Sequence, residues 1–160
     1  MTTTVSFPSE QFPAYPAISV EAPDGWTPIV APGMVLALGR TPEPGVFRAN
    51  VVVAVSRFPA GYQLSTATES VMEKFASLAD AHEIGRETAT IGGLEWFHIE
   101  SSFNDPRVGT LVQSAHLAIV DHGSVVDLVQ VTGTVTGSQA HENVLDEVRA
   151  IQRSATARAQ

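Results

Sequence analysis

The sequence predicts an α+β domain in which a mostly antiparallel sheet is covered by helices. The first observation is a run of three long stretches with strand-like alternation, at residues 94–103, 110–120 and 124–135, joined by two short connections that contain glycine. The second observation is that residues 64–80 and 138–154 change to the spacing of amphipathic helices. Strands joined by tight turns pair antiparallel, and helices then cover the apolar surface of the sheet.

The middle stretch of the three shows why the sheet needs cover. Its odd positions form a clearly apolar face, made by Leu111, Gln113, Ala115, Leu117 and Ile119. Its even positions form a mixed face, made by Val112, Ser114, His116, Ala118 and Val120. Two helices cannot shield both faces of strands this long, so we expect part of the mixed face, with Val112, His116 and Val120, to remain available for contact.

The N-terminal half supplies an arm and three strands. Residues 1–16 contain three prolines and predict an extended arm. Residues 17–29 predict a short strand, a Pro-Asp-Gly turn and then Trp26, which we expect to anchor the turn on the core. Residues 34–40 predict a second strand. Residues 51–58 are apolar on both faces, which indicates a central strand and favours an α/β/α sandwich over a helix-grip fold with both helices on one face.

The remaining elements follow from caps and turns. A capping box formed by Thr66 and Glu69 predicts the start of the first helix. Residues 82–93 have few apolar side chains and predict an edge strand that ends in a glycine turn. Ser138 is the expected N-cap of the last helix. The predicted organisation is therefore an arm at 1–16, a single domain at 17–154 and a disordered tail at 155–160.

Composition narrows the function classes. Nine Lys and Arg against seventeen Asp and Glu give a formal charge of −8, which disfavours nucleic acid and anionic membranes as partners. The absence of cysteine excludes disulfides, thiolate metal sites and a thiol nucleophile. The first ten residues lack the basic and apolar segments of a signal peptide, and no stretch predicts membrane insertion. We therefore expect a cytoplasmic protein.

Two short motifs carry a family resemblance. A P-x-G-W turn occurs at residues 23–26, and an F-x-x-N-V strand start occurs at residues 47–51. With the terminal meander and helix, these motifs make residues 17–154 resemble the PsbP-like fold, and most of all the actinobacterial LpqN-type proteins. The resemblance implies a small interaction or adaptor module without catalysis. LpqN-type lipoproteins carry a lipidated cysteine, which this chain lacks, so the resemblance does not extend to membrane anchoring.

No motif in the sequence predicts a catalytic or cofactor site. His98 and His116 lie on adjacent predicted strands, and a five-residue loop places them opposite each other, with Glu100 on the face of His98. A two-histidine, one-carboxylate metal site is conceivable there, but ordinary strand histidines are the simpler interpretation, so we expect no metal and no cofactor. Asp127, inside the last strand, is expected to be structural, at the rim of the sheet or paired with Arg57 or Arg107.

The sequence therefore predicts a non-catalytic interaction module with an unknown protein partner. The alternative is a protein that binds a small apolar ligand in a pocket between sheet and helix. The predicted interaction surface joins two groups of side chains, one on the sheet and one on the arm. They are Val112, His116 and Val120, with Phe7, Phe12 and Tyr15. We expect a homodimer through this surface.

Overall fold

Seven strands form a single antiparallel sheet in the order β2-β3-β4-β8-β7-β6-β5 in the computed structural model, which describes residues 1–160. These strands are β2 (Trp26–Pro28), β3 (Leu36–Arg40), β4 (Asn50–Pro59), β5 (His82–Ile91), β6 (Leu94–Asp105), β7 (Gly109–Asp121) and β8 (Val125–Thr136). The predicted meander is confirmed as β6, β7 and β8, which are neighbours in the sheet. The expected edge strand is β5, and the doubly apolar strand β4 lies inside the sheet.

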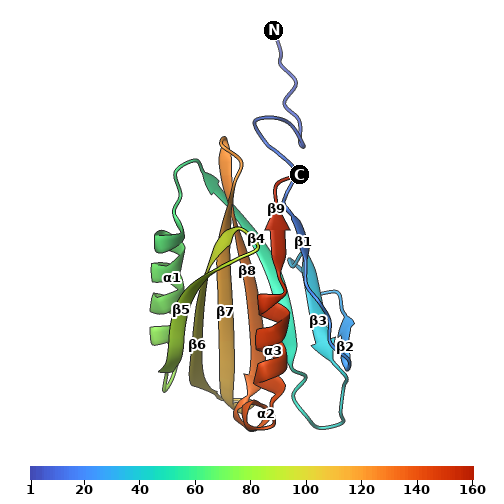
Figure 1. The fold of residues 1–160 in the computed structure, drawn as a ribbon, viewed down its shortest axis with the longest axis vertical. Helices are drawn as coiled ribbons and strands as arrows, with labels where there is room; N and C mark the ends of the chain where they lie inside the picture. The colour runs from blue at the N-terminus through green and yellow to red at the C-terminus, as the bar shows by residue number, and fades with distance from the viewer.

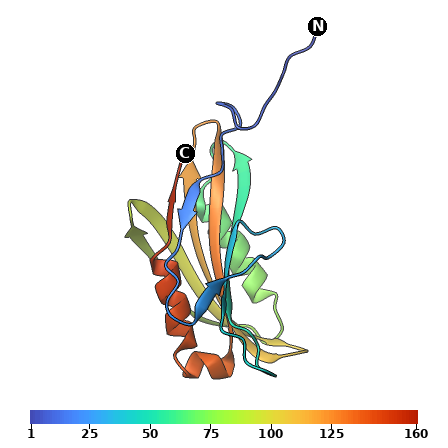
Figure 2. The same ribbon diagram turned by 90° about the vertical axis from the view of Figure 1, so that its right-hand side faces the viewer.

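The helices cover opposite faces, so the predicted sandwich is confirmed (Figures 1 and 2). The helix α1 (Leu64–Ala76) buries Val71 and Phe75 against the apolar face, where Leu117 and Leu128 lie. The helices α2 (Gly137–His141) and α3 (Val144–Arg153) follow β8, and α3 buries Val148 and other apolar residues against the other face. Each face therefore has its own apolar core.

The helix α3 approaches the sheet closely at one glycine. A Cβ atom added at Gly133 of β8 would lie 2.1 Å from Cγ1 of Val148, which is fully buried. Only a residue without a side chain allows this approach, because core packing leaves no room for an extra methyl group. Gly133 therefore fixes the position of α3 and of the side chains that α3 carries onto the sheet.

Both predicted helix starts differ from the structure. The helix α1 begins at Leu64, two residues before the predicted cap, and its N-cap Gln63 makes no side-chain capping bond. At the C-terminal end the capping box is formed by Thr136 and Gln139, so Ser138 is not the N-cap. The predicted single helix is divided into α2 and α3 because Asn143 adopts a left-handed conformation with φ of 70°.

The C-terminal tail is ordered, contrary to the expectation of disorder. Residues Thr156–Arg158 form β9, which pairs antiparallel with β1 (Ala17–Ser19). The pairing extends the core, since Ala155 is buried and Ala157 packs against the α3-side cluster. The sequence alone does not predict this strand, because Ala157 is its only inward-facing residue. The domain therefore extends past residue 154.

Candidate binding pocket

His98 and His116 face each other across β6 and β7, as their spacing predicts. The strand register pairs the two residues directly, and their Nδ1 atoms lie 3.0 Å apart. On the same face, the His98 Nε2 atom lies 2.8 Å from Oε2 of Glu100. Side chains two residues apart on a strand share a face, so β6 alone brings His98 and Glu100 together.

Arg149 of α3 completes this cluster from the opposite layer. Its guanidinium donates two hydrogen bonds to the Glu100 carboxylate, from Nε at 2.8 Å and from Nη2 at 2.6 Å. Burial acts to raise the pKa of Glu100, but the hydrogen bonds from Arg149 and His98 outweigh burial and lower this pKa to about 2. Glu100 is therefore a carboxylate at neutral pH, held by a two-pronged ion pair.

The negative charge of Glu100 fixes the position of one imidazole proton, on His98. An ionised carboxylate only accepts hydrogen bonds, so the His98 Nε2 atom carries the proton that faces Glu100. The contact between the two Nδ1 atoms holds one proton, supplied by either ring according to its tautomer. Burial, with smaller effects from the charges of His98 and Arg153, lowers the pKa of His116 to about 3, so this ring is neutral.

Two buried polar atoms beside this chain of bonds have no hydrogen-bond partner. They are Nε2 of His116 and Nε1 of Trp96, whose side chains are 3% and 1% exposed. The two rings are stacked, with centroids 4.5 Å apart and planes inclined by 10°. Buried polar groups are normally paired, so two unpaired buried atoms on stacked rings are unusual.

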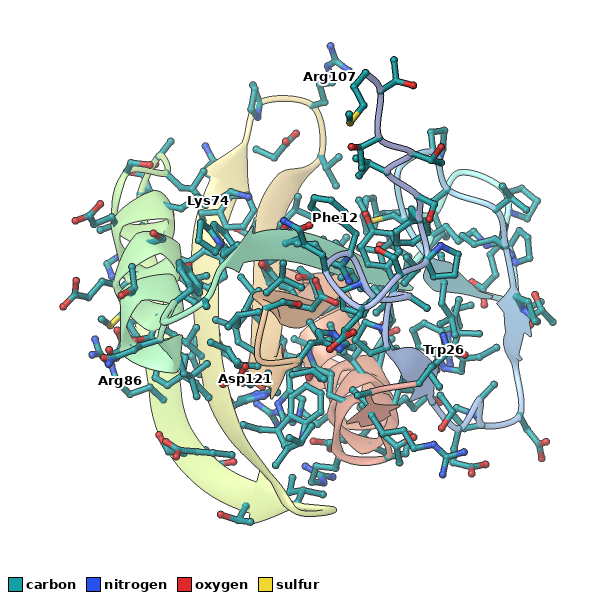
Figure 3. The ribbon with its side chains drawn as sticks, turned by 90° about the horizontal axis from the view of Figure 1, so that it is seen from above. Phe12, Trp26, Lys74, Arg86, Arg107 and Asp121 are labelled. Atoms are coloured by element: carbon teal, nitrogen blue, oxygen red, sulfur yellow. The ribbon has the colours of Figure 1, made fainter.

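Both rings line a pocket of about 370 Å³ between α3 and the β5–β6 hairpin. Three arginines also line it: Arg86 from the edge strand β5, and Arg149 and Arg153 from one side of α3. Figure 3 places Arg86 at the β5 end of the sheet, with Trp26 toward the opposite end. A second hollow, mostly apolar, shares Trp96 with this pocket and is also lined by residues of β1 and β9. In Figure 1, β9 lies beside the β5–β6 turn.

The floor of the pocket is held by a further set of buried hydrogen bonds. Ser114 of β7 donates to the Oε1 atom of Gln152 at 2.8 Å, and its hydroxyl also lies 3.2 Å from Glu100. The Gln152 amide donates to the backbone carbonyls of Ser114 and Val131. These bonds tie α3 to β7 and β8, and so they hold the pocket open in one geometry.

The arrangement does not match the metal site that the three residues could have formed. No group of three or more His, Cys, Asp or Glu side chains is placed to hold a metal ion. The two imidazoles point their Nδ1 atoms at each other, and Arg149 engages both oxygens of Glu100. What the geometry offers is a fixed set of hydrogen-bond donors and acceptors.

The sheet part of the predicted interaction surface is buried, which corrects that expectation. Val112, His116 and Val120 are each 5% exposed or less. The prediction was wrong because it considered only two helices as cover for the sheet. It included neither β9 nor the close approach of α3 to the sheet. The homodimer remains a prediction, but it can no longer use this face.

The open surface of the sheet lies on the other face, where α1 covers only part of it. The half-buried side chains there are Gln113, Gln130, Thr132 and Thr134, and they bond among themselves, as in the bond from Gln113 to Thr134 at 3.2 Å. Phe7, Phe12 and Tyr15 are exposed to 57%, 37% and 45%. The arm packs on its own chain, with the guanidinium of Arg57 4.6 Å from the Tyr15 ring.

Two further candidates are structural. Asp127 is fully buried and pairs with Arg57 through two bonds of 2.8 Å, and with His122 at 2.7 Å. Burial raises the pKa of Asp127, but the hydrogen bonds from Arg57 and His122 outweigh burial and keep this pKa below its ordinary value. Trp26 is 5% exposed and donates its Nε1–H to Glu147 of α3 at 3.1 Å. No helix of the structure has the length and apolar character needed to cross a membrane.

Comparisons with known proteins agree on the fold. No family model matches the sequence, and no curated protein matches it. LpqN of Mycobacterium tuberculosis, a protein involved in cell envelope biogenesis, matches in structure with a TM-score of 0.77 and 15% identity, over 91% of this chain and 85% of LpqN. The cyanobacterial PsbP of Synechocystis sp. PCC 6803 matches with a TM-score of 0.52 and 12% identity, over 97% of this chain and 98% of that protein. A mutant of protein Mog1 matches with a TM-score of 0.55 and 12% identity, over 88% and 90%. The chain therefore has a PsbP-like fold, and the resemblance to LpqN is confirmed at the level of structure.

Proposed function

We propose that this chain is a non-catalytic interaction module that recognises a protein partner at the mouth of the pocket between α3 and the β5–β6 hairpin. The observation that carries the proposal is that the ionisable groups of the pocket are committed to one another. The pKa of Glu100 is about 2 and that of His116 is about 3. General acid–base catalysis works best with a pKa near the working pH, so these groups suit recognition better than proton transfer.

The charge of the pocket mouth indicates the chemistry of the partner. Arg153 is exposed at the α3 side of the mouth and makes no ion pair, on a chain whose formal charge is −8. A local cationic site on an acidic protein steers an acidic group to one place and repels it elsewhere. The proposed partner therefore presents an aspartate or glutamate side chain to this mouth.

The test compares two charge reversals at exposed arginines. Arg153→Glu reverses a charge at the pocket mouth. Arg107→Glu reverses a charge in the turn between β6 and β7, which lines a different hollow, and serves as the matched control. A partner captured from the native cell, and then purified, is expected to bind the wild type and the Arg107 variant equally and to lose at least tenfold in affinity for the Arg153 variant. Equal binding to all three proteins would contradict the proposed site.

A second candidate function is the binding of a small ligand inside the same pocket. The volume of about 370 Å³ falls in the range of small-molecule sites, and two buried polar atoms in the lining have no partner. The lining is rich in arginine and histidine, so the expected ligand is polar, whereas the sequence predicted an apolar ligand.

A cytoplasmic location stays a prediction, which cell fractionation checks.

A further inference from the structure

The strand β5 is an open edge of the sheet beside the pocket between α3 and the β5–β6 hairpin. It ends the sheet (Figure 1), pairs only with β6, and makes no backbone hydrogen bond to any other element. Its residues are exposed apart from Ile91, which is half-buried. The regular part of the edge begins at Gly85, after a register shift from Glu83. An uncovered edge of this length presents free N–H and C=O groups with which another strand can pair.

The turn after β5 identifies which backbone groups are free. The two glycines at residues 92–93 have φ of 59° and 83°, as in a two-residue type I′ hairpin. In such a turn the flanking residues, here Ile91 and Leu94, form a hydrogen-bonded pair. Bonded and non-bonded pairs alternate along an antiparallel ladder, so every second residue of β5 points its N–H and C=O away from β6. The residues with free groups at the regular edge are Arg86, Thr88 and Thr90.

The two faces beside this edge offer different surroundings to the side chains of an added strand. On the α3 side, Glu87 and Ala89 lie opposite His98 and Trp96, at the pocket of about 370 Å³. On the α1 side, a hollow of about 210 Å³ lies between α1 and the start of β5, and most of its lining is apolar. The apolar residues of this α1 hollow are Met72, Phe75, Ala76, Ala81 and Ile99. Alternate side chains of an added strand therefore meet a polar pocket on one side and an apolar hollow on the other.

Positive charge prevails on the polar side. Arg153 lines the pocket and makes no ion pair or side-chain hydrogen bond. Arg158 of β9 lines the adjoining hollow and also makes no ion pair. Glu87 is the one acid of the pocket lining without an ion pair, because Glu100 is paired with Arg149. Two free arginines against one free carboxylate favour acidic side chains on this face of an added strand and disfavour basic ones.

We propose that β5 pairs with an extended segment of the protein partner, in which acidic side chains that face the pocket alternate with apolar side chains that face the α1 hollow. The inference deepens the proposed function and rests on it, because it names the way in which the partner reaches the pocket mouth. Backbone bonds along the edge supply affinity, and the two hollows supply selectivity. A second copy of this chain fits less well, because its own β5 brings Arg86, Thr88 and Thr90 to the apolar side.

A peptide probe tests the inference on the ¹⁵N-labelled full chain. The probe is a capped heptapeptide that alternates valine and aspartate, and its counterpart alternates valine and lysine. The aspartate peptide is expected to bind in a saturable way and to slow exchange of the amide hydrogens of Arg86, Thr88 and Thr90 at least tenfold. The amides of Glu87 and Ala89, which already bond to β6, are expected to change less. The lysine peptide is expected to bind at least tenfold more weakly.

Two changes at one position separate the backbone from the side chain. Thr88→Pro removes an N–H from the open edge without removing a bond to β6, so it is expected to weaken binding of the aspartate peptide at least tenfold. Thr88→Val keeps the N–H and is expected to bind as the wild type does. Unchanged amide shifts in β6, β7 and β8 check that the proline variant keeps its sheet, and the exchange pattern of the wild type decides independently of this variant. Arg153→Gln is expected to reduce the preference for the aspartate peptide over the lysine peptide.

Three results with the peptides would overturn the inference. They are no saturable binding of the aspartate peptide, equal binding of the two peptides, and protection of β5 amides without alternation. Slow exchange of the same amides in a free protein that light scattering shows to be a dimer would assign the edge to a second copy, and would also overturn it.

The failure of this inference is distinguishable from the failure of the proposed function. If the peptides show no strand pairing while Arg153→Glu still weakens binding of the purified partner, only the pairing with β5 is wrong. If the partner binds the wild type and both charge-reversal variants equally, the proposed site itself is wrong, whatever the peptides show.

Discussion

Acidification should destabilise this protein through His116 well before its carboxylates titrate. The ring is neutral in the folded state, where its pKa is about 3, and has the ordinary value of 6.5 when the chain unfolds. Between these two values the unfolded state binds one more proton than the folded state. The stability that His116 contributes is therefore fully present above pH 6.5 and is lost as the pH falls toward 3.

The magnitude follows from the difference between the two pKa values. Each pH unit below 6.5 costs about 1.4 kcal/mol for one proton, so the loss at about pH 5 is roughly 2 kcal/mol. Glu100, with a pKa of about 2, adds its own loss only below its ordinary value of 4.5. A comparison of about pH 7 with pH 5 therefore measures the contribution of His116 without that of Glu100.

Urea denaturation of three proteins at about pH 7 and pH 5 isolates the effect. His116→Asn keeps a polar amide near the position of Nδ1 and removes the titrating ring, so its stability should fall by about 2 kcal/mol less than that of the wild type. His82→Asn, a change at an exposed histidine of β5, is the matched control and should follow the wild type. Identical pH dependence in all three proteins would refute the assignment of a buried neutral His116.

Two further changes probe how α3 is attached. Trp26→Ala should lower the free energy of unfolding by about 3–5 kcal/mol in urea denaturation, as for a buried large aromatic, whereas Trp26→Phe should cost less because only the bond to Glu147 is lost. A stable Trp26→Ala protein that no longer binds a partner would show a functional role instead. Gly133→Ala should cost about 1–3 kcal/mol because its methyl group meets Val148, and the double variant with Val148→Ala should cost less than the sum of the two single changes. Strict additivity would argue against the close approach.

Much of the fold could be predicted from local patterns. Alternating apolar residues identify β6, β7 and β8, and their short turns make the pairing antiparallel, so the facing of His98 and His116 follows from loop length alone. The doubly apolar run of β4 indicates an interior strand and helices on both faces. These features depend on residues close in sequence, which is why a single sequence contains them.

The pocket could be predicted only in part. Glu100 and the two histidines share a strand pair, but the partner that fixes their chemistry is Arg149, which comes from the last helix and from the other layer. The only signal for it was the pair of cations at Arg149 and Arg153, four residues apart and so on one side of a helix. Cations in the last turns of a helix also suit the negative end of the helix dipole, so this pair does not by itself indicate a partner on the sheet. The rotation of α3 is set by Gly133, a long-range contact.

The same reasoning explains the error over the exposed face. Val112 and Val120 looked available because nothing in the sequence shows that β9 pairs with β1, or that Ala155 and Ala157 join the cluster on this face. A three-residue strand is too short to give a periodic signal of its own. Its partner is more than a hundred residues away, so only the assembled structure shows the pairing.

The central claim is that recognition takes place at the pocket between α3 and the β5–β6 hairpin. The most direct measurement is to map backbone amide shifts of the ¹⁵N-labelled chain during titration with its purified partner. The shifts are expected to concentrate in β5, in β6 near Trp96 and His98, and in the last turns of α3 near Arg153. Shifts confined to the open face around Gln113 and Thr132, with the pocket unchanged, would contradict it.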